Sequence, residues 1–249
     1  MTLPLPEADD TEQPPPVPAP PWGVKEILQA IGLLLAGVIF VVGIAGLVVA
    51  ATDASLSDTE TLGVSILGTL ILEIALFGLA AGFTVWKFRL SWRALGFLVP
   101  RADRVWVPIA TVVGTFAVLS VYAILVDLIG ADELLPQDTL QENVFDHRAL
   151  VILAGILAVI TAPIAEETFF RGFLFIGLTK RFGFVWAAAI SGFLFALAHG
   201  EPSTLIPFTI VGMVFAWAYV AAGSLWGAIA AHLIFNLISF LAALAGVAE

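Results

Sequence analysis

The chain has 249 residues, of which 60% are hydrophobic and only 12% are charged. Soluble domains are roughly half apolar and about a quarter charged, so this composition predicts a membrane protein. The formal net charge of −10 argues against nucleic acid as a partner, which calls for a basic patch. The absence of cysteine excludes disulfides, thiolate metal ligands and a thiol nucleophile.

The chain begins with a polar segment, residues 1–23, which is acidic and rich in proline. Such a segment cannot bury a core, so we expect a disordered tail. Hydropathy and helix breakers then predict membrane spans at residues 27–51, 62–86, 105–129, 149–169, 184–199, 204–221 and 225–247. Pro163 interrupts the fourth span, whose pattern runs on to about Lys180, so the count is seven, or eight if that segment is doubled.

The predicted fold is therefore an all-α polytopic transmembrane bundle of about seven to eight spans. N-terminal transmembrane helices occupy residues 24–148, and a C-terminal core of four helices occupies residues 149–249. Membrane barrel strands would alternate between apolar and polar residues, and none of the apolar runs does so.

Lysine and arginine are concentrated in alternate loops. They precede the first span, follow the second and follow the fourth: Lys25, Lys87, Arg89, Arg93, Arg101, Arg104, Lys180 and Arg181. The other loops are acidic, with Arg148 as the single basic exception. The positive-inside rule then predicts an integral, multi-pass protein of the cell membrane, surrounded by lipid, with a cytoplasmic N-terminus.

Some polar side chains lie inside the predicted spans or at their ends: Glu73, Glu166, Glu167, Arg171, His199, His232 and Asn236. A charge at membrane depth costs about 2.5 kcal/mol or more, and such residues usually face the bundle interior and mark a site. Glu167 and Arg171 are four apart, share a helix face and can form an ion pair. Glu166 is rotated by about 100° from Glu167, so it has no local partner and is free for chemistry. The alternative is that all three form a structural triad.

The two histidines of the later spans suggest what that chemistry is. His199 ends the FALAH stretch at a helix end where water can enter, and His232 and Asn236 share one face of the last span. Either histidine alone is equally well explained as an interior imidazole that bonds a neighbouring helix. The combination favours hydrolysis: Glu166 takes a proton from water that His199 helps to hold, while His232 and Asn236 donate hydrogen bonds to the developing oxyanion.

A zinc ion is the alternative to this metal-free arrangement. Glu166, His199 and His232 are a ligand set of the kind that soluble metalloproteases use. The HExxH motif, the commonest local zinc signature, is absent from the sequence. Residue types and spacing do not choose between the two versions.

Three motifs connect this pattern to a known family. EETFFR at 166–171 matches EExxxR, FALAH at 195–199 matches FxxxH, and HLIFN at 232–236 matches HxxxN. In this order and spacing they resemble the CPBP family of intramembrane proteases, also called the CAAX protease and bacteriocin-processing or Abi family. That family includes the eukaryotic type II CAAX prenyl endopeptidases. The similarity covers about residues 150–247, and the earlier spans match only in being hydrophobic.

The resemblance implies an intramembrane endopeptidase that cleaves a peptide or protein substrate at the membrane. It implies that Glu166 is the catalytic glutamate, that His199 holds the water and that His232 and Asn236 bind the oxyanion. Glu167 and Arg171 would be the supporting pair. The family has been described both as metalloproteases and as enzymes that use a glutamate-activated water. We favour the second version, with no cofactor.

Two further classes of function stay open. One is a non-catalytic immunity or scaffold protein that uses the fold to bind a partner, and the intact motifs count against it. The other is a proton-coupled carrier, because buried Glu and His also build proton relays. Against a carrier, the polar groups cluster in the C-terminal half and no inverted repeat is visible.

Overall fold

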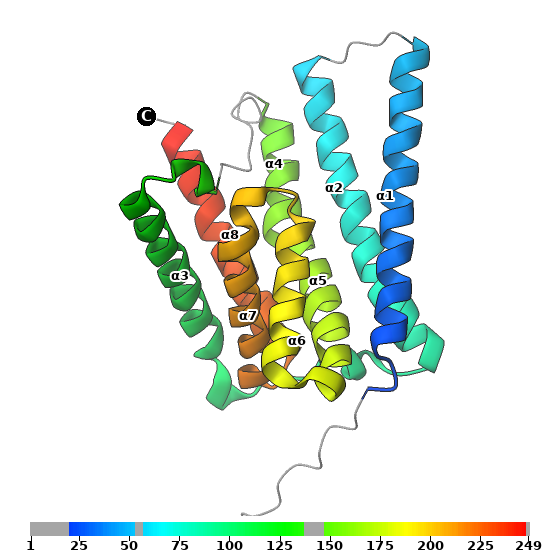
Figure 1. The fold of residues 1–249 in the computed structure, drawn as a ribbon, viewed down its shortest axis with the longest axis vertical. Coiled ribbons are helices and arrows are strands. Elements are labelled where there is room, and N and C mark those ends of the chain that lie inside the picture. The colour runs from blue at the N-terminus through cyan, green and yellow to red at the C-terminus, as the bar shows by residue number, and fades with distance from the viewer. Residues whose placement is uncertain (1–19, 53–56, 137–146, 248–249) are drawn as a thin grey trace, which may run out of the picture.

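A computed structural model describes residues 20–52, 57–136 and 147–247 of the chain. These residues form a bundle of helices, which confirms the predicted polytopic helical fold (Figure 1). The long helices are α1 (Val24–Thr52), α2 (Asp58–Ala81), α3 (Val107–Ile129), α6 (Ile176–Ala198), α7 (Leu205–Ala222) and α8 (Leu225–Val247), with shorter α4 (Arg148–Ile156) and α5 (Ala162–Glu167). The expected disordered tail falls mainly on residues 1–19, which lie outside the described residues.

Six helical stretches of the described chain are long and apolar enough to cross a membrane. The fourth, Arg148–Ala198, contains a break at Gly183, where φ is 70° and ψ is 179°. Glycine adopts such a positive φ without a steric penalty. The break divides the stretch into two arms, and the chain reverses its direction there (Figure 1). The predicted spans 149–169 and 184–199 lie one on each arm.

The helix continues past Pro163, where the sequence analysis expected an interruption. A π-helical turn at Leu157–Thr161 comes just before the proline, and Pro163 occupies the first turn of α5. A proline is tolerated at that position because the first N–H groups of a helix need no intrahelical acceptor. A second π-helical segment, Thr168–Phe175, joins α5 to α6.

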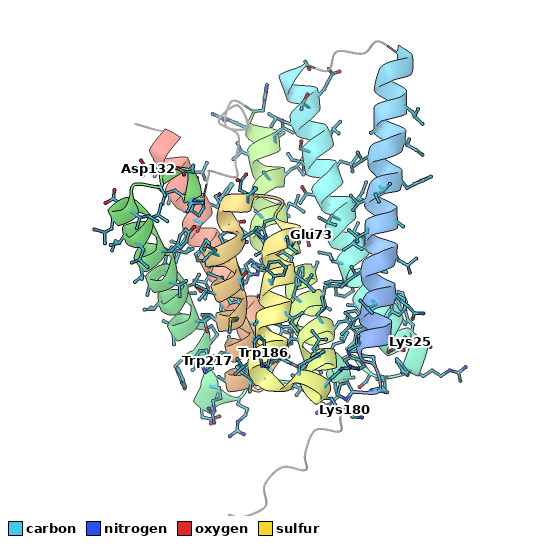
Figure 2. The ribbon with its side chains drawn as sticks, viewed as in Figure 1. Lys25, Glu73, Asp132, Lys180, Trp186 and Trp217 are labelled. Atoms are coloured by element: carbon cyan, nitrogen blue, oxygen red, sulfur yellow. The ribbon has the colours of Figure 1, made fainter. Side chains whose placement is uncertain are left out.

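The two ends of the bundle differ in charge, as the predicted loop pattern requires. Lys25 and Lys180 lie at one end and Asp132 lies at the other (Figure 2). Trp186 and Trp217 are close to the lysine end, where the amphipathic indole suits a membrane interface (Figure 2). The assignment of the lysine end to the cytoplasm remains a prediction.

Helices α1 and α2 stand at one side of the bundle (Figure 1). Much of α1 is apolar and exposed, including Ile39, Phe40 and Leu47, as expected for a surface in contact with lipid. Helix α2 starts with a capping box in which Ser57 and Glu60 satisfy each other's backbone N–H groups. It packs against α5 and the π-helical segment that follows α5.

Helices α6 and α7 approach so closely that their backbones touch at two glycines. A Cβ on Gly212 would lie 2.5 Å from the Cα of Gly192, and a Cβ on Gly192 would collide with the carbonyl oxygen of Thr209. Small residues at such a crossing let membrane helices pack tightly without a hydrophobic driving force. The crossing lies beside the site described below, because the carbonyl of Gly212 binds Arg171.

We expect Gly212→Ala to destabilise the protein, because the added methyl group forces the two backbones apart. Overpacking of this kind costs about 1–3 kcal/mol of unfolding free energy, which a thermal unfolding curve in detergent would report as a lowered midpoint. Gly37→Ala is the matched control, since a Cβ there meets no atom within 4 Å. Equal midpoints for the two variants would contradict the close crossing.

Candidate active site

Glu167 is the centre of a buried hydrogen-bonded cluster. Its Oε1 accepts a hydrogen bond from Nη1 of Arg171 at 2.7 Å, and Nδ1 of His232 lies 2.9 Å from the same oxygen. The side chains of Glu167 and Arg171 are fully buried. Because an ionised carboxylate only accepts, the imidazole carries its proton on Nδ1 in this contact. The predicted pair of Glu167 and Arg171 therefore exists, and it also fixes the ring of His232.

Arg171 connects this cluster to two further helices. Its Nη2 donates to the carbonyl oxygen of Gly212 on α7 at 3.2 Å. The guanidinium carbon lies 4.5 Å from the ring centroid of Phe195 on α6 and 5.2 Å from that of Phe215 on α7. A cation over aromatic faces is attracted by their quadrupoles, and the attraction is strongest where water is excluded. The buried charge is thus compensated by a carboxylate, a carbonyl and aromatic rings.

Glu166 lies beside the other nitrogen of the same imidazole. Its Oε2 is 3.8 Å from Nε2 of His232, which is longer than a hydrogen bond. The side chain of Glu166 is 15% exposed, whereas that of Glu167 is fully buried. The two neighbouring glutamates therefore differ as expected: one is engaged in the cluster, and the other faces Nε2 of His232 with part of its surface accessible.

A further carboxyl group is buried in the N-terminal half of the chain. Glu73 on α2 is 3% exposed, and its Oε2 is buried without a hydrogen-bond partner among the described residues. Helix α2 packs against α5, which carries Glu166. The burial of Glu73 agrees with the expectation that an intramembrane charge faces the bundle interior.

His199 is held at the exposed end of α6. Its Nδ1 donates to the carbonyl oxygen of Phe195 at 2.8 Å, and its ring packs on the rings of Phe195 and Phe208 with centroids 4.7 and 4.8 Å apart. The ring of Phe195 also faces His232, at a centroid distance of 6.0 Å. The two histidines therefore both pack against the ring of Phe195.

Asn236 lies one helical turn beyond His232 on α8. Its Nδ2 donates to the carbonyl oxygen of Ala158 at 2.8 Å. Ala158 belongs to the π-helical turn before Pro163, and such turns alter the regular hydrogen bonding of the helix. Asn236 therefore joins α8 to the arm that carries the two glutamates, and one of its two amide N–H groups is left for another acceptor.

The structure does not gather the alternative zinc set into one group. Within residues 20–52, 57–136 and 147–247, no three His, Asp or Glu side chains are grouped so that they could hold one metal ion. Ligands of one zinc ion must each lie about 2 Å from it.

The C-terminal part of the chain is similar to a family of membrane endopeptidases, in agreement with the resemblance that its three motifs indicated. Residues 148–238 match the family described as "Rce1-like: Type II CAAX prenyl endopeptidase Rce1-like". This segment contains all six predicted site residues.

A named relative agrees with this match. The chain is 33% identical over 95 residues to the Bacillus subtilis (strain 168) protein named "Putative membrane peptidase YdiL". The match covers 38% of this chain and 39% of the relative, so less than half of either protein is compared. No solved structure is significantly similar to the chain.

Proposed function

We propose that the protein is an intramembrane endopeptidase that hydrolyses a peptide bond of a membrane-associated substrate with a water activated by Glu166. The observation that carries the proposal is the position of Glu166. It is partly exposed and lies 3.8 Å from Nε2 of an imidazole whose other nitrogen is bound by Glu167. A carboxylate beside an oriented imidazole is suited to general acid–base chemistry. The similarity to a protein named as a membrane peptidase supports the same activity.

In the proposed reaction Glu166 takes one proton from water while the water oxygen attacks the carbonyl carbon. The carbonyl oxygen becomes an oxyanion, and protonated Nε2 of His232 and the second N–H of Asn236 stabilise it. Glu166 then gives its proton to the amide nitrogen as the C–N bond breaks, which restores the carboxylate and releases an acid and an amine. His199 holds the attacking water before the attack. Glu167 and Arg171 keep the imidazole oriented.

The direct test is cleavage of membrane-spanning peptides by the purified protein in liposomes, followed by mass spectrometry of the products. We expect defined fragments that accumulate with time in the presence of the wild-type protein. Peptides that bind but are not cut by the correctly folded protein would contradict the proposal and favour a non-catalytic binding protein. The same peptides without protein give the background.

Metal dependence is tested on the same sample. We expect cleavage to continue after dialysis against a chelator, and elemental analysis to find much less than one zinc per chain. Stoichiometric zinc, together with activity that disappears on chelation and returns on zinc addition, would replace the metal-free reaction by a zinc-dependent one.

A further inference from the structure

We propose that Trp22, which lies just before α1 and outside the segment that matches the protease family, is a positioning residue of the active site. Its indole is bound to the backbone of the π-helical segment that carries Arg171. This bond holds the segment in the register in which Arg171 connects Glu167 to α7. The catalytic part of this inference rests on the proposed function. The start of α1 then supports the active site and is more than a lipid-facing anchor.

The side chain of Trp22 packs where the π-helical segment passes into α6. The residue is 3% exposed, and its Nε1 donates a hydrogen bond to the carbonyl oxygen of Phe173 at 3.0 Å. A Cβ on Gly177 would lie 2.8 Å from Cδ1 and 2.9 Å from Nε1 of the indole, so the ring lies directly on the backbone of α6. Tryptophan suits such a place because it buries a large apolar area while its N–H finds an acceptor.

The chain that follows Trp22 is fixed by a glutamate in the first turn of α1. Oε2 of Glu26 accepts the backbone N–H of Gly23 at 3.1 Å, and its Oε1 binds Nζ of Lys87 at 2.9 Å. Lys87 comes directly after the π-helical turn at the end of α2. Most of α1 beyond residue 31 is exposed, so the contacts that attach this helix to the catalytic arm are concentrated at its start.

The π-helical segment after α5 is held by hydrogen bonds from other parts of the chain. At its end the N–H of Ile176 is shared between the carbonyl oxygens of Arg171 and Phe173, five and three residues earlier. A carbonyl oxygen has two lone pairs, so that of Phe173 can also accept the indole N–H. Ser191 on α6 donates to the carbonyl oxygen of Phe170 at 2.7 Å. The two outside donors thus bind on either side of Arg171.

The register of this segment decides where Arg171 points. A π-helical turn contains more residues than an α-helical turn, and one residue corresponds to about 100° of rotation in an α-helix. Arg171 binds Glu167 at 2.7 Å and the carbonyl oxygen of Gly212 on α7 at 3.2 Å. Spacing alone allows the first contact, whereas the second depends on the rotation of the segment. Because Glu167 also fixes His232, a change of register would disturb the imidazole beside Glu166.

The positioning is tested without substrate by nuclear magnetic resonance of protein labelled with ¹⁵N in its three histidines. The Nδ1 proton of His232, which is bound to Glu167, should give a strongly deshielded signal, assigned by its loss in His232→Ala. Trp22→Phe removes the N–H donor and keeps an aromatic ring, and we expect it to shift or broaden this signal. Trp186→Phe is the matched control and should leave the signal in place, because Trp186 is 67% exposed. An unchanged signal in folded Trp22→Phe protein would overturn the positioning role even if the protein is a peptidase.

Gly177→Ala tests the same contact from the opposite side, because the added methyl group pushes the indole away. Gly177→Ala and Trp22→Phe should each lower kcat about 10- to 100-fold with little change in KM, since a misplacement of about 1 Å can cost that much. In the double variant the smaller ring makes room for the methyl group, so the combined loss should be much less than the two single effects together. Gly37→Ala, whose Cβ meets no atom within 4 Å, controls for the substitution itself.

Ile27→Ala separates positioning from stability. Ile27 is 3% exposed and lies against Gly177, so its truncation weakens the packing of α1 but keeps the indole N–H. We expect a lowered midpoint of thermal unfolding and a kcat per folded molecule near the wild-type value. If Trp22→Phe and Gly177→Ala likewise lower the midpoint and leave both kcat and the His232 signal unchanged, the start of α1 is an anchor and the inference is wrong. Absence of cleavage by the wild-type protein would refute the proposed function, while the histidine signal would still decide the positioning.

Discussion

Glu166→Gln is expected to abolish peptide cleavage while the protein still inserts, folds and binds detergent as the wild type does. Glutamine keeps the size and one carbonyl oxygen of the side chain but cannot accept a proton from water. Loss of a general base typically costs about 10²- to 10⁴-fold in rate, so product formation should fall to near the background. Quantitative mass spectrometry of a cleaved peptide in liposomes measures kcat and KM for both proteins.

Two histidine variants test whether residues other than the proposed base are also needed for cleavage. His199→Ala should also lose cleavage, because we assign His199 to holding the water, and its exposed place at the end of α6 makes the protein tolerant of truncation there. His147→Ala is the control for a histidine that lies far from the cluster, since its Nε2 bonds Thr59 at an exposed position. Cleavage retained by folded Glu166→Gln protein would remove the mechanism. Cleavage retained by His199→Ala alone would remove only its role in holding water.

The spans and the ion pair of Glu167 with Arg171 could be predicted because hydropathy and helical spacing are local properties. The reversal at Gly183 likewise falls between the predicted spans 149–169 and 184–199, next to Lys180 and Arg181. The path of the chain at Pro163 could not be predicted, because a π-helical turn lets the helix continue there. Whether a helix bends or breaks at a given residue depends on whether its freed backbone groups find hydrogen-bond partners on neighbouring helices. Tertiary packing decides this.

The contacts that orient the site are those that local patterns cannot specify. His232 binds Glu167 across 65 positions, and Arg171 binds the carbonyl oxygen of Gly212 across 41 positions. An intramembrane carboxylate signals that a partner exists, but its partner is set by how the helices pack. Asn236 similarly shares the face of His232 as predicted, while its bond to Ala158 depends on an irregular turn in another helix.

Glu167→Leu is expected to destabilise the protein by about 3–5 kcal/mol, because it leaves the fully buried Arg171 without its carboxylate. Asp103→Ala is the control: it breaks an ion pair with Arg101 that is exposed, and such pairs contribute about 0–1 kcal/mol. Thermal and denaturant unfolding in detergent compare the two. A Glu167→Leu protein as stable as the wild type would contradict the compensation described for this cluster.

The double variant Glu167→Leu with Arg171→Met distinguishes stability from catalysis. Replacing both members of a buried ion pair by apolar side chains of similar volume is often neutral for stability, so this protein should unfold much closer to the wild type than the single variant. Its His232 has nevertheless lost the acceptor that fixes Nδ1, and the imidazole can turn away from Glu166. We therefore expect a stable protein with greatly reduced kcat. A double variant that is both stable and fully active would show that the cluster supports the fold alone, and that Glu166 needs no oriented imidazole beside it.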